Sequence, residues 1–201
     1  MGRLSQVVLA SSNAGKLNEL ARLLAALRIE LIAQSTLGVE DADETAPTFI
    51  ENALLKARHA AASTSLPALA DDSGIVVAAL DGAPGIRSAR YAGHHGDDAA
   101  NNRKLLARLD GADDRSAHFY CALALVRHAA DPAPIIATGA WYGTIGFAPR
   151  GAQGFGYDPL FVPHGGGLTA AELSPAQKNR ISHRARATAN LLDQVRVAND
   201  A

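Results

Sequence analysis

Two adjacent carboxylates, Asp71 and Asp72, follow a short apolar run and precede a Ser-Gly pair. The run Leu66–Ala70 predicts a buried strand, so both carboxylates are expected at its carboxyl end, where open α/β sheets bind ligands. Neighbouring strand residues point to opposite faces, so only one of the two can face a ligand squarely. The pair indicates Mg²⁺ and phosphate chemistry, and the alternative is an Asx turn that closes the strand.

The segment Ser11–Lys16 joins a predicted strand to a predicted helix. At such a junction the free backbone N–H groups and the positive helix end favour a phosphate, and Lys16 adds a positive charge. The segment is not a P-loop, because that motif requires Gly where Ala10 stands and Ser or Thr where Leu17 stands. The alternative is an ordinary helix start capped by Ser or Asn.

The segment Glu40–Glu44 carries four carboxylates in five positions. In most proteins such a segment is a solvated acidic loop. The alternative is that one carboxylate, with Glu44 as the candidate, shares a hard cation with Asp72. Mg²⁺ takes one or two carboxylates together with phosphate oxygens and waters, which agrees with such a pair.

A glycine-rich segment, Gly151–Pro159, leads into the predicted strand Leu160–Val162. Its glycines let the backbone approach a ligand, and Phe155 or Tyr157 could stack on a flat base. The alternative is a plain loop whose aromatic residues anchor it to the core.

The predicted C-terminal helical region carries Lys178 and then Ser182-His183-Arg184. Lys178, His183 and Arg184 are possible donors to a phosphate or to a base carbonyl. The alternative is a solvated basic face of a helix.

The sequence argues against several other chemistries. The histidines show no metal-ligand spacing, since His94 and His95 are adjacent and diverge. The single cysteine, Cys121, lies inside an apolar run, which excludes an intramolecular disulfide and argues against a nucleophile. No Gly-x-Ser-x-Gly elbow occurs, and the Gly154–Gly156 segment does not open a helix, so a dinucleotide site is poorly supported.

The spacing of apolar residues predicts the elements that must position these groups. Strands are predicted at Val7–Ala10, Leu66–Ala70, Ala117–Val126, Ile135–Ile145 and Leu160–Val162. Helices are predicted at Lys16–Leu27, from a capping box at Thr48–Glu51 to about Thr64, at Asp98–Leu109, and from Ser174 to about Val195. βαβ units followed by a β-hairpin favour an α/β protein with a mixed sheet flanked by helices, and a cleft between two lobes would suit it.

The bulk properties limit the class of protein. The 201 residues suffice for one substantial core, so the expected organisation is a single domain, 1–201, in two lobes. A formal net charge of -1 argues against non-specific binding to nucleic acid or to an acidic membrane surface. No apolar run approaches the ~20 residues of a membrane span, and Val7–Ala10 is too short for a signal peptide. A cytoplasmic location is the default expectation.

Seven segments, taken together and in order, resemble the inosine/xanthosine triphosphate pyrophosphatases, which hydrolyse noncanonical purine nucleoside triphosphates. The resemblance runs from Val7 to about Leu192, nearly the whole chain. Each segment is weak alone, but seven in register are specific. They are Ser11–Lys16, Thr48–Ala53, Ala70–Gly74, Gly82–Ile86, Ser88–Tyr91, Gly154–Pro159 and Ser182–Arg184.

The resemblance implies an elongated mixed sheet, a nucleotide cleft between two lobes, a homodimer and dependence on Mg²⁺. By position, Asp72 resembles the catalytic carboxylate and a metal ligand, and Glu44 is a further metal candidate. The other matched positions resemble contacts to the nucleotide: Ser11, Ser12, Asn13, Ala14, Gly15, Lys16, Ser73, Phe155, Gly156, Tyr157, Asp158, Lys178, His183 and Arg184.

Two alternatives to this function stay open at the level of the sequence. A related pyrophosphatase could prefer pyrimidine or methylated nucleotides. A non-catalytic nucleotide-binding protein could keep the phosphate loop without turnover, although Asp72, Lys16 and Glu44 are all present.

Overall fold

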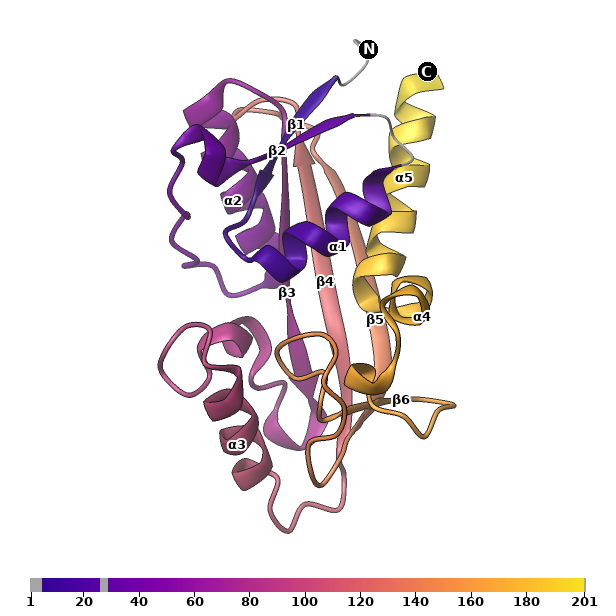
Figure 1. Ribbon diagram of the computed structural model, residues 1–201. Coiled ribbons are helices and arrows are strands. Elements are labelled where there is room, and N and C mark those ends of the chain that lie inside the picture. Colours follow the sequence, from indigo (N-terminus) through magenta and orange to yellow (C-terminus); the bar gives the residue numbers. More distant parts are fainter. Residues whose placement is uncertain (1–4, 26–28, 201) are drawn as a thin grey trace. The chain divides into compact units, whose positions relative to one another are not determined.

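A computed structural model describes residues 5–25 and 29–200 (Figure 1). Its strands are β1 (Gln6–Ala10), β2 (Glu30–Ala33), β3 (Ala68–Val77), β4 (Ser116–Val126), β5 (Ile135–Ile145) and β6 (Phe161–Pro163). Its α-helices are α1 (Ala14–Leu24), α2 (Phe49–Thr64), α3 (Asp98–Arg108), α4 (Pro175–Ile181) and α5 (His183–Asp200). Short 3₁₀ helices are η2 (Gln34–Leu37), η3 (Ala78–Leu80), η4 (Gly85–Arg90) and η5 (Ala170–Glu172). None of the described helices is long and apolar enough to cross a membrane.

The strands form one sheet in the order β2-β1-β3-β4-β5-β6. β1 is parallel to both β2 and β3, with Leu9 opposite Leu69. β5 and β6 are antiparallel. The N–H of Ile145 donates to the carbonyl of Arg115 at 2.9 Å, so the end of β5 lies beside the start of β4, as a hairpin requires. The predicted mixed α/β sheet is therefore confirmed.

The contacts divide the chain into two compact units. Unit 1 comprises the residues up to Asp72, Cys121–Gly139 and the residues from Arg184 onward, and unit 2 comprises Ser73–Tyr120 and Ala140–His183. β3, β4 and β5 each contribute residues to both units. The single domain 1–201 and the cleft between two lobes stay predictions.

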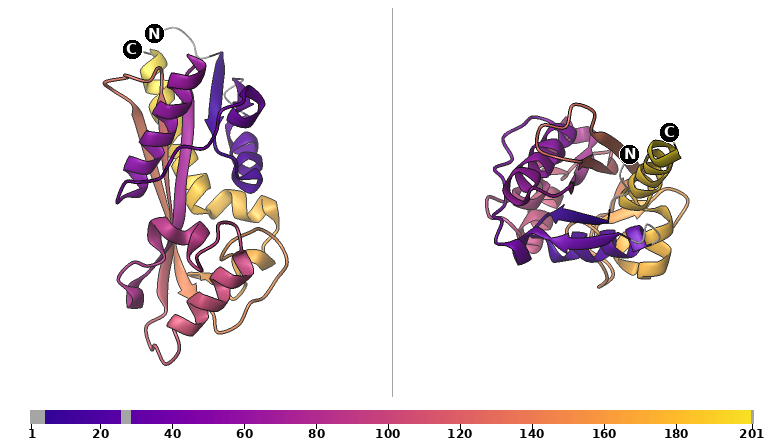
Figure 2. Two further views of the ribbon diagram at one scale, coloured as in Figure 1. Left: turned by 90° about the vertical axis from the view of Figure 1, so that its left-hand side faces the viewer. Right: turned by 90° about the horizontal axis from the view of Figure 1, so that it is seen from above.

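In unit 1, helices pack on both faces of β1 (Figures 1 and 2). Val7 and Leu9 point into a core that also contains apolar residues of α1 and α5, such as Leu20 and Leu191. Val8 points to the opposite face, because side chains alternate along a strand. On that face α2 contacts β1 and buries a stripe of small alanines. The predicted capping box is present, since the N–H of Glu51 donates to the Thr48 hydroxyl that caps α2.

In unit 2, the core is built from the remaining parts of the long strands and from α3. The buried residues include Ile75 and Val77 of β3, Leu105 of α3 with Leu109 just after it, and an aromatic group centred on Phe161. The Phe161 ring meets the rings of Phe119 and Trp141 edge-on, with centroids 4.8 and 5.2 Å away.

Two sequence predictions are corrected by the structure. The strand predicted at Leu66–Ala70 continues as β3 to Val77, so Asp71 and Asp72 lie inside a strand rather than at its end. The Ser-Gly pair, which would be typical of a turn after the strand, lies inside β3. Gly74 instead allows close packing, since a Cβ there would lie 2.3 Å from the Ser88 hydroxyl oxygen. The predicted C-terminal helix is two helices, since the backbone of Ser182 is extended between α4 and α5.

Candidate functional site

Polar side chains hold the loop between β1 and α1. The side chain of Asn13 caps α1 by accepting the N–H of Lys16 at 3.0 Å, and the Ser11 hydroxyl accepts the N–H of Asn13 at 3.2 Å. The hydroxyl of Ser12 donates to the carboxylate of Asp41 in the acidic segment. Ala14 and Gly15 form the first helical turn, where backbone N–H groups lack partners inside the helix. The start of α1 is therefore capped by a side chain, as one alternative predicted, and this cap does not prevent the same helix end from binding a phosphate.

Asp71 is the centre of a buried ionic group in unit 1. Its Oδ1 lies 2.8 Å from Lys16 Nζ, and its Oδ2 lies 2.8 Å from Arg184 Nε. The guanidinium of Arg184 also pairs with Glu19, and the thiol of Cys121 lies 3.2 Å from Asp71 Oδ2. Burial raises the pKa of Asp71, but the charges of Arg184 and Lys16 outweigh it and hold that pKa well below its usual value. Asp71 is therefore ionised.

Cys121 is buried, as predicted for a residue inside a strand. Burial and the neighbouring Asp71 raise the pKa of its thiol well above the usual value. The thiol is therefore protonated, which agrees with the exclusion of a cysteine nucleophile.

Asp72 faces a different set of charges, because it points to the other side of β3. Its Oδ1 accepts from Lys56 Nζ at 2.8 Å, and the same ammonium donates to Glu44 Oε1 at 2.8 Å. Burial raises the pKa of Asp72, and the opposing charges of Lys56 and Lys16 do not cancel this effect. The pKa of Lys56 is itself raised: burial lowers it, but Asp72 and Glu44 prevail. Asp72 thus combines a protonatable carboxylate with a fixed positive neighbour.

Glu44 and Asp72 fit a divalent cation that phosphate oxygens help to bind. Both carboxylates converge on one position, which the Lys56 ammonium contacts. Asp72 Oδ2 is buried and accepts no hydrogen bond, so it retains lone pairs for a cation. Within the described part of the chain no three His, Cys, Asp or Glu residues cluster in a way that could hold a metal. Two carboxylates with phosphate oxygens and waters nevertheless complete the shell that Mg²⁺ prefers.

In unit 2, Asp158 and Lys178 form a second buried ion pair. Lys178 Nζ lies 2.6 Å from Asp158 Oδ2, and both side chains are buried. The same Asp158 oxygen accepts the N–H of Phe155 at 3.0 Å, and the Lys178 ammonium lies 5.0 Å from the centre of the Phe155 ring. Three of the predicted nucleotide contacts therefore hold one another in place.

The neighbouring residues Gly156 and Tyr157 anchor the glycine-rich loop. The N–H of Gly156 donates to Oδ2 of Asp98, the first residue of α3, at 2.6 Å. The ring of Tyr157 is buried, and its hydroxyl donates to the carbonyl of Ser88 at 2.9 Å. Tyr157 therefore anchors the loop to the core. Phe155 is only partly buried and stays the candidate for stacking on a base.

His183 and Ser73 complete the predicted residues of unit 2. His183 is buried at the start of α5, with its ring stacked on that of Phe119 at a centroid distance of 4.8 Å and on that of Trp141 at 6.5 Å. Ser73 follows Asp72 in β3 and is half-buried. The phosphate-loop residues Ser11–Lys16, together with Glu44, Asp72 and Arg184, thus lie in unit 1. The other predicted contacts lie in unit 2: Ser73, Phe155, Gly156, Tyr157, Asp158, Lys178 and His183.

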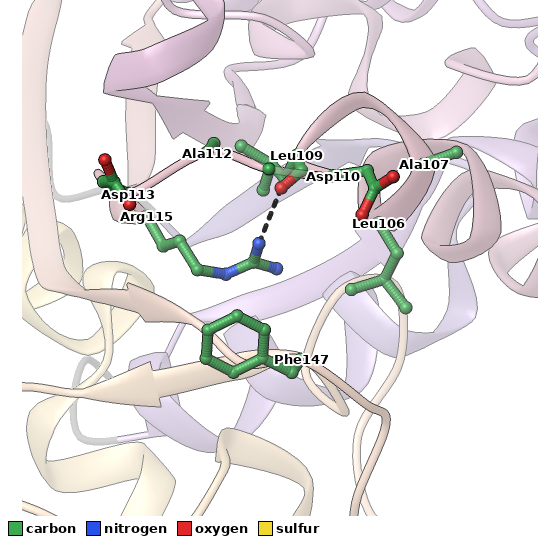
Figure 3. A pocket seen from close by; sticks show the side chains of 9 residues that line it. Leu106, Ala107, Leu109, Asp110, Ala112, Asp113, Arg115 and Phe147 are labelled. Atoms are coloured by element: carbon green, nitrogen blue, oxygen red, sulfur yellow. Dashed lines mark hydrogen bonds between the residues drawn. The ribbon is translucent and has the colours of Figure 1, made fainter.

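One surface pocket of about 640 Å³ contains none of these residues (Figure 3). It lies in unit 2 and is lined in part by Leu106, Asp110, Asp113 and Phe147. The guanidinium of Arg115 covers the exposed Phe147 ring and donates to the carbonyl of Leu109 at 2.9 Å. Arg115 is thus engaged in supporting the pocket wall.

Sequence reasoning missed Lys56 and Glu19. Asn52 and Lys56 are four residues apart in α2 and therefore share a face beside the buried Ala53 and Ala57. Two polar residues next to the small alanines of this helix were the available signal for Lys56. Glu19 carried no such signal, because its partner Arg184 is 165 residues away in the chain.

The fold and these charged groups define an α/β protein with buried carboxylates and lysines beside a helix N-terminus, a set suited to phosphate chemistry. The model of the Ham1 family matches residues 7–194. The chain belongs to the Ham1 family.

Relatives and solved structures agree with this assignment. The dITP/XTP pyrophosphatase of Aromatoleum aromaticum is 57% identical over 194 residues, which cover 96% of this chain and 98% of the relative. The dITP/XTP pyrophosphatase of Bordetella pertussis is 58% identical over 196 residues, which cover 96% of this chain and 92% of the relative. The structure of a HAM1 protein from Coxiella burnetii superposes with a TM-score of 0.88 at 50% identity, covering 98% of this chain and all of that one. The structure of the Staphylococcus aureus Ham1 protein superposes with a TM-score of 0.84 at 38% identity, covering 98% of this chain and all of that one.

Proposed function

We propose that this protein hydrolyses the noncanonical purine nucleoside triphosphates ITP, dITP and XTP to the monophosphate and pyrophosphate, and so removes them from the nucleotide pool. The observation that carries the proposal is Asp72, a buried carboxylate with one oxygen on Lys56 and the other without a hydrogen-bond partner. The Aromatoleum and Bordetella relatives, which are named dITP/XTP pyrophosphatases, support this reaction with dITP and XTP.

The reaction requires in-line attack of water on the α-phosphorus and stabilisation of the leaving pyrophosphate. We assign Asp72 to orient and deprotonate that water, which agrees with the raised pKa of its carboxyl. Lys16 and the backbone N–H groups of Ser11–Gly15 would bind the phosphate oxygens, and Lys56 keeps the Asp72 carboxylate oriented. Asp72 and Glu44 would hold Mg²⁺, which supplies positive charge to the phosphate oxygens when bound.

The residues of unit 2 would bind the rest of the nucleotide. Phe155 is the stacking candidate, because its ring is partly exposed and is fixed by the Asp158–Lys178 pair. Ser73, Gly156, Tyr157 and Asp158 would supply or support further contacts.

Base selection would depend on hydrogen-bond donors. Hypoxanthine and xanthine carry a carbonyl at C6 where adenine carries an amine, so a donor such as His183 or Arg184 pairs with the former and faces the latter donor to donor. An unpaired buried donor costs roughly 1–3 kcal/mol, which corresponds to about a ten- to hundredfold preference per contact.

The proposal is tested by measuring pyrophosphate release from inosine, deoxyinosine, xanthosine, adenosine, guanosine and thymidine triphosphates at equal concentration, with and without Mg²⁺. We expect release from the first three, and only with Mg²⁺. Preference for thymidine triphosphate would instead favour the alternative of a related pyrophosphatase that acts on pyrimidine nucleotides. Binding of the nucleotides without release would favour the non-catalytic alternative.

We further propose that the protein acts in the cytoplasm, where the nucleotide pool lies, as a homodimer. Light scattering coupled to size exclusion measures the mass in solution, and a monomeric mass at micromolar concentration would contradict the dimer.

A further inference from the structure

Asp71 is bound by cations from two different predicted motifs. Lys16 belongs to the proposed phosphate loop and Arg184 to the proposed base-recognition motif, and each lies 2.8 Å from a separate oxygen of this one carboxylate. The side chain of Asp71 is fully buried, and that of Arg184 is 1% exposed. The reaction assigned to Asp72 makes no use of Asp71.

Glu19 extends this arrangement into a chain of four charged groups. It lies on α1, one helical turn after Lys16, and its carboxylate pairs with Arg184 Nη1. The two carboxylates and two cations sum to zero charge, with Asp71 on β3 and Arg184 on α5. Because buried charges are stable only when they are paired, removal of one member leaves another uncompensated. The position of each cation therefore depends on the carboxylates.

We propose that Asp71 and Glu19 are positioning residues that fix the Arg184 guanidinium for base selection and couple it to Lys16. This inference rests on the proposed function and deepens it, because it assigns two residues that determine substrate specificity without touching the substrate. Arg184 is held at both Nε and Nη1, so its planar group has one orientation. A fixed orientation is what discrimination between a carbonyl and an amine requires.

The coupling follows from the shared carboxylate. Phosphate oxygens compete with Asp71 for Lys16, since both are anions that the same ammonium can bind. When a triphosphate binds Lys16, the Lys16–Asp71 ion pair is weakened, and Asp71 then pairs mainly with Arg184. Loss of the Asp71 charge should therefore tighten phosphate binding at Lys16 while loosening the arginine.

The experiment compares two isosteric variants, Asp71→Asn and Glu19→Gln, with the control Asp131→Asn. Asp131 is also a buried aspartate of unit 1 that pairs with an arginine, since its Oδ2 lies 2.7 Å from Arg127 Nε, but it has no place in the proposed site. For each protein we would measure the ratio of kcat/KM for dITP over dATP, the affinity for tripolyphosphate by calorimetry, and the thermal midpoint.

We expect the dITP/dATP ratio to fall at least about tenfold in Asp71→Asn and Glu19→Gln, the size of one lost discriminating contact. Tripolyphosphate affinity should rise in Asp71→Asn and stay unchanged in Glu19→Gln. The control should melt at a lower temperature with its ratio within about twofold of the parent. If Asp71→Asn fails to fold, Glu19→Gln decides, because the Glu19 side chain is 16% exposed and only borders the buried group.

An unchanged ratio in the folded variants would overturn the inference, as would an equal fall in Asp131→Asn, which would make the effect one of general stability. Failure of the proposed function is distinguishable, because the parent protein would then release no pyrophosphate from dITP. In that case unaltered tripolyphosphate affinity in Asp71→Asn would still count against the coupling.

Discussion

At the scale of residues, Asp71 and Asp72 show how the surroundings separate two identical side chains. Burial raises the pKa of both carboxyls, but Arg184 and Lys16 prevail at Asp71. At Asp72 burial prevails over Lys56 and Lys16, and Glu44 adds a like charge. Asp71 thus suits a permanently charged structural role, and Asp72 suits exchange of a proton with water.

The first prediction concerns Asp72→Asn. The amide keeps the shape of the carboxylate but cannot accept a proton, so kcat for dITP should fall by about two to four orders of magnitude. Circular dichroism and the thermal midpoint should show a folded protein. Turnover within tenfold of the parent would remove Asp72 from the mechanism.

A second prediction separates Glu44 from its acidic neighbours. Glu44 converges with Asp72 on Lys56, whereas Asp43 is exposed. Glu44→Gln should therefore raise the Mg²⁺ concentration needed for half-maximal activity about tenfold or more, and Asp43→Asn should leave it within about twofold. Equal shifts in the two variants would mean that the acidic segment acts only through its overall charge.

At the scale of elements, η4 packs closely against β3 because residue 74 of the strand is a glycine. Gly74 lies where η4 packs against the strand, and the Ser88 hydroxyl both accepts the N–H of Ile75 at 2.9 Å and donates to the carbonyl of Gly85 at 2.6 Å. Any side chain at position 74 would meet this pair of hydrogen bonds. The glycine allows close approach of η4 rather than a turn.

The third prediction follows from that contact. In Gly74→Ala the new Cβ would lie 2.5 Å from the carbonyl oxygen of Gly85, so the free energy of unfolding should fall by about 1–3 kcal/mol or more. Urea denaturation measures the change. The matched control is Gly167→Ala, whose Cβ meets open space and which should change stability little. Equal stability of the two variants would refute the packing role.

At the scale of the whole molecule, buried carboxylates link stability to pH. Hydrogen bonds from the Arg127 side chain hold the pKa of Asp131 well below its usual value against the effect of burial. The folded chain therefore binds fewer protons at Asp131, as at Asp71, than the unfolded chain does. Their stabilisation is complete above the pKa of an unfolded aspartate, about 3.9, and is lost as the pH falls toward the folded values. Asp72 acts in the opposite direction, because its pKa is raised.

The fourth prediction tests this linkage in the presence of a chelator. Asp131→Asn should lower the free energy of unfolding at pH 7 by about 1.5–3 kcal/mol, the worth of hydrogen bonds to a charged group, and should make it less dependent on pH below about 4. The exposed Asp114 provides the control, since Asp114→Asn should change stability only slightly. An unaltered acid dependence in Asp131→Asn would show that Asp131 does not contribute to it.

Much of the fold was predictable because local patterns and tertiary packing agree. The periodicity at Ile135–Ile145 and the capping box before α2 predicted these elements closely, since a strand face and a capped helix need only near neighbours. The end of β3 was not predictable from Ser73-Gly74, because the pair that normally indicates a turn here serves the approach of η4.

Residue types and their spacing were enough to predict the mixed α/β class, the family that the motifs resemble and the chemical groups at the site. How those groups are paired became visible only in the folded chain: Glu44 with Asp72 through Lys56, and Lys16 with Arg184 through Asp71. This is because composition and spacing fix which charges exist, whereas burial and the distances between remote segments fix which charges meet and which protons they keep.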